Sequence, residues 1–200
     1  RDKAQAEKDF QAAMEAWPRI NDLRFAYAGF LRAQKRPDEA IKVLQTVADK
    51  GKSAPDVLTA RGQIAGLLLE SGKTDDARAR YRAAIDLVTK PGSEVSEYDH
   101  ALLGLAYARL GEAKPAMEQS DEALALAVKS HKHDLPQGIK YVQAEIQLAL
   151  GNKSAAVDRL AEVLSMDPSD IRAPWLLFLP RMQLEPTWDP IRHDPRFQAL

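Results

Sequence analysis

The sequence contains no cysteine, and this absence removes several kinds of chemistry at once. Disulfide bonds, thiolate zinc sites and a cysteine nucleophile are all excluded. Aromatic residues make up only 6% of the chain, and only 10 of its 200 residues are glycine. Alanine, by contrast, occurs 32 times. Because sheets favour aromatic and β-branched side chains whereas alanine is the best helix former, this balance predicts closely packed helices.

The sequence also lacks a large excess of charge of one sign, and it has no long apolar run. The formal net charge at pH 7 is only -1. Nucleic acid is therefore not expected as a partner, because nonspecific binding to it depends on clustered Lys and Arg side chains. The longest apolar stretches, Ala101–Ala108 and Trp175–Leu179, are much shorter than the roughly 18 residues that cross a bilayer. We expect no membrane insertion, and the compartment, cytoplasmic or periplasmic, stays open.

What the sequence does contain is an internal repeat. Five segments align on an alanine, and successive anchors are 34, 37, 39 and 40 residues apart: Ala6, Ala40, Ala77, Ala116 and Ala156. A small residue stands twelve positions before each of the last four anchors: Ala28, Ala65, Gly104 and Ala144. Each complete repeat also carries a turn residue between its two helices: Lys35, Gly72, Gly111 and Gly151. Small residues at the first two sets of positions let neighbouring helices approach each other closely.

This pattern resembles the tetratricopeptide repeat, a helix–turn–helix unit of about 34 residues. The third repeat shows the resemblance best, with Leu103-Gly104-x-x-Tyr107-x-x-x-Gly111 followed by Ala116. The resemblance implies an all-α fold, a right-handed α-solenoid in which each repeat buries its apolar face against the next. Within a single solenoid over residues 1–200, we expect four complete repeats over residues 21–168. Residues 1–18 would be the second helix of a truncated upstream repeat, and residues 169–200 a capping helix with a proline-rich tail.

The last thirty residues differ from the repeats. Five of the 12 prolines lie after residue 173, which excludes a regular long helix there. We expect a helix to begin within Ile171–Met182 and to cover the open end of the fourth repeat. Beyond it, Trp188, Ile191 and Phe197 are expected to be anchors that fold back onto the solenoid.

The segment Trp188–Phe197, with the sequence W-D-P-I-R-H-D-P-R-F, is similar to the ending of large bacterial signalling proteins. In those proteins, tetratricopeptide arrays follow a serine/threonine kinase, an adenylate cyclase or a winged-helix domain. The similarity implies that this chain is a module of such a protein. No motif of those front-end domains occurs in the sequence, so the similarity carries over no enzymatic residue and a noncatalytic role is expected.

Several patterns look like chemical sites without having the required geometry. The stretch Gly66–Thr74 has five residues between its glycines, one more than a phosphate-binding loop allows, and is expected to be a turn. Residues 131–134 (H-K-H-D) offer too few fixed ligands for a metal. The carboxylates of Asp38 and Glu39 begin a helix, where negative charge is favoured. We expect no catalytic residue, no cofactor and no metal. Gly62 and Gly66 predict close packing of their helix.

The resemblance also implies a concave groove lined by the first helix of each repeat, with a peptide or protein segment as its ligand. In such a groove aromatic side chains supply contact area and charged side chains supply register. The residues assigned to the groove are Asp22, Phe25, Arg32, Arg36, Glu70, Lys73, Tyr98, Leu105, Arg109, Tyr141 and Glu145. A merely solvated concave face is the alternative. The lysine–asparagine clamp of chaperone-tail binders is missing, because pairs such as Phe25/Gly29 and Tyr141/Glu145 hold its positions.

Self-association is the second interaction hypothesis. Residues 1–18 are expected to leave Phe10, Met14 and Trp17 exposed, because the helix that should cover them is not in the sequence. Two copies could then form a homodimer through this surface. A spacer role beside a kinase, cyclase or DNA-binding domain is the remaining alternative.

Overall fold

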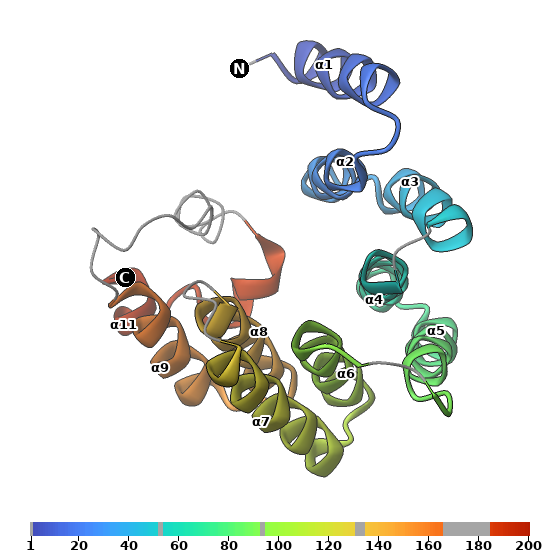
Figure 1. Ribbon diagram of the computed structural model, residues 1–200. Coiled ribbons are helices and arrows are strands. Elements are labelled where there is room, and N and C mark those ends of the chain that lie inside the picture. Colours follow the sequence, from blue (N-terminus) through green and yellow to red (C-terminus); the bar gives the residue numbers. More distant parts are fainter. Residues whose placement is uncertain (1, 52–53, 93–94, 131–134, 166–184) are drawn as a thin grey trace. The chain divides into compact units, whose positions relative to one another are not determined.

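The computed structural model in Figure 1 describes residues 2–51, 54–92, 95–130, 135–165 and 185–200. It divides into an N-terminal unit, Arg1–Leu87, and a C-terminal unit, Val88–Leu200. The helices that begin in the N-terminal unit are α1 (Lys3–Ala16), α2 (Asn21–Ala33), α3 (Pro37–Lys50), α4 (Ala54–Glu70) and α5 (Thr74–Val88). The C-terminal unit contains α6 (Glu97–Leu110), α7 (Ala113–Lys129), α8 (Leu135–Ala149), α9 (Lys153–Leu164), the 3-10 helix η3 (Pro186–Ile191) and α11 (Pro195–Gln198).

Within each unit, consecutive helices pack beside one another as helix–turn–helix pairs, which confirms the predicted all-α solenoid (Figure 1). The small residues predicted for the four complete repeats are among the least exposed in the described chain, whereas the first anchor, Ala6, is only half-buried. The fully buried ones are Ala40, Ala65, Ala77, Ala116, Ala144 and Ala156. Larger apolar residues close the core around them, such as Leu31, Leu44 and Ile64 in the N-terminal unit. Gly104 is buried as well.

The turns between paired helices have a common backbone conformation. A positive φ occurs at each of the four predicted turn residues, with 59° at Lys35, 75° at Gly72, 80° at Gly111 and 85° at Gly151. In each turn the next amide donates to the carbonyl five residues earlier, as Arg36 does to Leu31 at 3.0 Å. This is the Schellman closure of a helix, which satisfies carbonyls left over at the last turn.

Lys35 is the one non-glycine residue with positive φ in the described chain. Because a β-carbon disfavours this conformation, Lys35→Gly is expected to stabilise the N-terminal unit by about 0.5–1 kcal/mol, after the added freedom of glycine in the unfolded chain is subtracted. Lys35→Ala removes the same amino group but keeps the β-carbon, and should leave stability nearly unchanged. Urea unfolding of the three proteins measures the difference. A Lys35→Gly protein no more stable than Lys35→Ala would contradict it.

The predicted close packing at Gly62 is wrong. A β-carbon built at Gly62 meets nothing within 4 Å, and one at Gly66 meets only the Tyr81 hydroxyl, at 3.6 Å. The close approach lies instead at Gly104 on α6, where a β-carbon would be 3.0 Å from the Ala116 carbonyl oxygen of α7. A helical spacing of two glycines shows that they share a face but not which face is packed.

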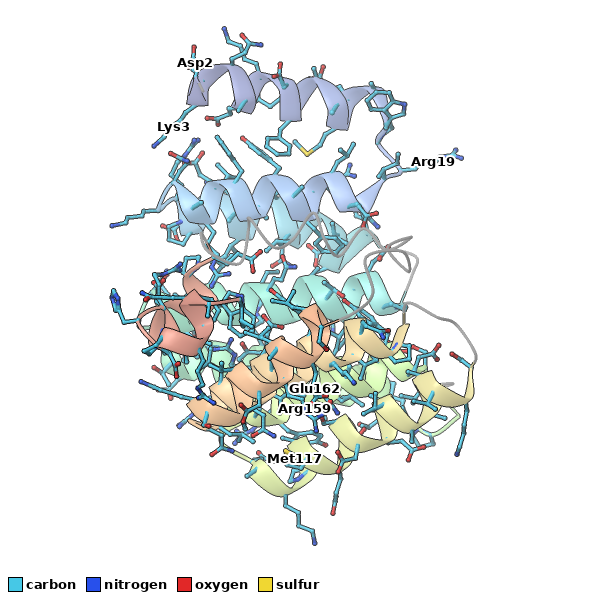
Figure 2. The ribbon with its side chains drawn as sticks, turned by 90° about the vertical axis from the view of Figure 1, so that its left-hand side faces the viewer. Asp2, Lys3, Arg19, Met117, Arg159 and Glu162 are labelled. Atoms are coloured by element: carbon cyan, nitrogen blue, oxygen red, sulfur yellow. The ribbon has the colours of Figure 1, made fainter. Side chains whose placement is uncertain are left out.

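Side chains at the N-terminal end differ in part from the expectation. Phe10 and Met14 are partly buried, and the Phe10 ring contacts those of Tyr27 and Phe30, with centroids 5.4 and 5.5 Å away. Their predicted exposure is therefore wrong, because α2 itself covers them. Trp17 follows the prediction and is 58% exposed. Figure 2 labels Arg19, two residues further along the chain, in the segment between α1 and α2.

In the C-terminal unit, polar contacts add to the packing of α7, α8 and α9. Figure 2 shows Arg159 beside Glu162 on α9, and Lys140 of α8 reaches the Glu162 carboxylate at 3.2 Å. The Gln147 amide of α8 donates to the Met117 sulfur of α7 at 3.4 Å. Within the described residues, no helix has both the length and the hydrophobicity that a membrane span requires.

The tail returns to the helices, as predicted for its three anchors. Trp188, Ile191 and Phe197 are all buried, and they pack with Ala144 of α8 and with α9. The expected capping helix within Ile171–Met182 lies outside the described residues.

Candidate functional site

The predicted groove residues of the N-terminal unit come from α2, from the turn after it, from the end of α4 and from the turn that follows α4. Two of them bind each other. Arg32 donates from Nε to Glu70 Oε2 at 3.0 Å, and its Nη2 contacts the other carboxylate oxygen. This bidentate pair is the strongest geometry for an arginine and a carboxylate. It joins α2 to α4 and neutralises two groups that the sequence assigned to a ligand.

Arg36 is also occupied, because it lies between two carboxylates. Its Nη atoms donate to Glu7 of α1 at 2.8 and 2.9 Å, and its Nε donates to Glu39 of α3 at 2.6 Å. The Tyr27 hydroxyl donates to the same Glu7 carboxylate at 3.0 Å. Arg36 therefore ties α1 to the start of α3, which gives it a structural role.

The hydrogen bonds from Arg36, followed by that from Tyr27, hold the pKa of Glu7 below its usual value. A lowered folded-state pKa means that the stabilisation is present above the unfolded-state pKa and is lost as pH falls through the folded one. The wild type should therefore be more stable than Glu7→Gln at pH 7, and the gap should close toward pH 3. Urea midpoints across this range test the expectation. Midpoints that differ equally at both ends would contradict it.

The three remaining groove residues of the N-terminal unit differ in how far they are buried and in what they contact. Phe25 packs against the hydrophobic core and is only partly accessible. Lys73 lies 3.6 Å from Asp38 in an exposed ion pair of the kind that contributes little stability. Asp22, in the first turn of α2, is exposed.

In the C-terminal unit, Tyr98, Leu105 and Arg109 share one face of α6, because they are spaced by seven and four residues. Tyr98 is 36% exposed. Leu105 packs against the core formed with α7 and α8. Arg109 is half-buried and forms no ion pair within the described residues.

Tyr141 on α8 is covered by the tail, which the sequence did not indicate. The Trp188 ring stands edge-on to it, with centroids 5.4 Å apart. Trp188 Nε1 donates to the Tyr141 hydroxyl at 3.2 Å, and that hydroxyl donates to Glu185 at 3.2 Å. Burial, with the negative charges of Glu145 and Glu185, raises the pKa of the Tyr141 phenol. Glu145, one turn further along α8, is half-buried.

Sequence reasoning missed Glu7, Glu39 and Glu185 as the partners of predicted groove residues. For the tail, the sequence did indicate that Trp188 is an anchor. It did not indicate that Trp188 contacts Tyr141. No group of three or more His, Asp or Glu side chains suited to a metal occurs among the described residues. The H-K-H-D stretch lies outside them.

Comparison with known proteins identifies the family. The model of the tetratricopeptide repeat matches residues 1–55 and 63–127, which is more than half of the chain. No curated protein matches the sequence. The matched residues include α1, α2, α3, α5 and α6 in full, with the positive-φ turns at Lys35, Gly72 and Gly111. On this evidence, the chain belongs to the tetratricopeptide repeat family.

Proposed function

We propose that this chain binds a peptide or protein segment of a partner along the first helices of its repeats, as a noncatalytic module of a bacterial signalling or regulatory protein. Tetratricopeptide repeats generally mediate protein–protein interactions and are typically noncatalytic scaffolds. The signalling context rests on the similarity of the segment Trp188–Phe197 to the endings of such proteins.

One observation carries the proposal most directly, and it lies on α6. Arg109 has no ion-pair partner within the described residues, whereas Arg32 and Arg36 are already paired with carboxylates. Its face of α6 also presents Tyr98, the only tyrosine among the exposed large apolar residues of the described chain. An aromatic side chain and an unpaired arginine, eleven residues apart on one helix face, offer contact area and a fixed charge to an acidic segment.

A photo-crosslinking amino acid at position 98 tests this proposal in lysate from the source cells. We expect it to capture a partner, and Arg109→Glu to abolish that capture. Lys114→Glu on α7 reverses an equally positive but highly exposed side chain and should leave capture intact. Capture that is unchanged by Arg109→Glu would contradict binding at this face. The same probe at Val128, an exposed position on α7, controls for nonspecific labelling.

Self-association is the second candidate, and the exposed Trp17 favours it. Trp17 and Ile20 are 58% and 45% exposed, and they lie three residues apart between α1 and α2. Large apolar side chains gathered on a surface are typical of an interface. Light scattering over a range of concentrations should then show a dimer that Trp17→Glu dissociates. A monomer at every concentration would remove this candidate, leaving the spacer role as the alternative to partner binding.

A further inference from the structure

The tail, residues 185–200, is held together by its own polar contacts. Arg192 Nη2 donates to the Glu185 carbonyl at 2.9 Å, and its Nε donates to the Asp189 carboxylate at 2.9 Å. The Asp194 side chain accepts from the Arg196 amide at 2.8 Å and so caps α11. These contacts fix the chain locally, so that the tail presents its side chains to α8 and α9 in an organised form.

The surface between the tail and the α8–α9 pair has a buried apolar centre. Trp188 is 0% exposed and lies in a cluster with Ala144, Val157 and Leu160. Ile191 and Phe197 complete this cluster from the tail side, and the Phe197 ring stacks near that of Trp188, with centroids 6.4 Å apart. The hydrogen bond from the indole to Tyr141 satisfies the one polar atom of the anchor.

The edge of the same surface is polar and exposed. Arg196 Nη1 donates to the Asp158 carboxylate of α9 at 2.9 Å, and Nη2 donates to the Ser154 hydroxyl at 3.3 Å. Asp158 and Arg196 both remain half or more accessible. A buried aromatic anchor surrounded by an exposed polar rim is the anatomy of a protein–peptide interface.

The corresponding surface of the N-terminal unit is covered in another way. There α4 packs on α2 and α3 with small and aliphatic side chains, among them Ala60, Ile64 and Leu67. The tail instead uses a tryptophan, and it hydrogen-bonds to Tyr141, one of the residues assigned to ligand binding. It therefore does more than cover an apolar end, because it also occupies a predicted ligand contact.

We propose that residues 185–198 are an intramolecular ligand, which occupies a site on α8 and α9 for partner segments of the same chemistry. Such a segment carries a tryptophan that fits against Tyr141, an aliphatic residue three positions later, and an arginine that faces Asp158. It binds by displacing the chain's own tail. This inference rests on the proposed function, in that the partner is a protein segment, but it places a second contact away from α6.

The test uses the full chain and a fluorescein-labelled synthetic peptide of residues 185–200. A tethered segment competes at an effective concentration in the millimolar range, so the peptide should bind the wild type poorly. Trp188→Ala removes the anchor of the tethered copy, and we expect the peptide to bind this variant at least about tenfold more tightly. Equal affinity for both proteins would overturn the proposal. Far-ultraviolet circular dichroism verifies that the variant remains helical.

Two further variants locate the peptide. In the Trp188→Ala background, Tyr141→Phe keeps the ring but removes the hydroxyl, and should weaken peptide binding. Asp158→Arg changes only an exposed rim residue, so it does not threaten the fold. It should weaken binding of the natural peptide, and a peptide with Arg196→Glu should restore it. If neither substitution changes the affinity for the peptide, the peptide binds elsewhere and the proposal is overturned. Crosslinking at position 98 addresses α6 alone, so the proposed function and this inference can fail separately.

Discussion

Replacing Trp188 with alanine should lower the free energy of unfolding of the C-terminal unit by about 3–5 kcal/mol, the usual cost of truncating a buried tryptophan. Trp188 is fully buried, it contacts both α8 and Phe197, and its indole nitrogen is hydrogen-bonded. The truncation therefore removes apolar contacts and leaves a cavity that the short tail would have to fill. Urea unfolding followed by circular dichroism gives the change in midpoint.

Trp17→Ala is the matched control, because it makes the same substitution at a side chain that is 58% exposed. Its expected effect is within about 0.5 kcal/mol. A Trp188→Ala protein as stable as Trp17→Ala would show that the tail adds nothing to the stability of α8 and α9. The apolar cluster of α6, α7 and α8 does not include Trp188, so those helices should keep their native helicity in the variant.

Two glycine-to-alanine substitutions should have opposite signs. At Gly104 the new β-carbon would lie 3.0 Å from the Ala116 carbonyl oxygen, 3.0 Å from Ile146 Cδ1 and 3.3 Å from the Ser120 amide nitrogen. Two of these neighbours are backbone atoms of α7, which cannot yield without moving the helix. Overpacking of this kind costs about 1–3 kcal/mol, so Gly104→Ala should be destabilising even though alanine is the better helix former.

Gly62→Ala makes the same chemical change in the interior of α4, where the β-carbon meets nothing within 4 Å. It should stabilise the N-terminal unit by about 0.5–1 kcal/mol through helix propensity alone. Thermal or urea unfolding of both variants measures the sign of each stability change. If both were stabilising, α6 and α7 would have to be separated more widely than the Gly104 contacts indicate.

The sequence was sufficient to predict the repeat register, for a physical reason. Small residues at a fixed spacing are needed wherever helices meet closely, so the spacing of Ala40, Ala77 and Ala116 is enough to indicate where the backbones pack. Lys35 was recognised as a turn residue from its alignment with glycines, and its positive φ follows from that position.

The candidate site was less predictable, because it depends on long side chains. The register places Arg32 and Arg36 on the first helix and the turn after it, but a guanidinium can reach a neighbouring helix and pair there. Glu70 follows Arg32 by 38 residues and Glu7 precedes Arg36 by 29, so each pair joins different helices, for which the period within one helix gives no register. The tail has no periodic pattern. Its apolar anchors could be recognised in the sequence, but no spacing indicated that Trp188 contacts Tyr141.

The setting of Trp188 also gives the protein a spectroscopic reporter of its own. Tryptophan emission moves to longer wavelength when the indole passes from an apolar cluster into water, and Trp188 is completely enclosed. The sequence has three tryptophans, so changing Trp17 and Trp175 to phenylalanine leaves a single emitting indole at position 188. In that protein the colour of the fluorescence reads out whether the tail is seated, without a label, during any titration with a candidate partner.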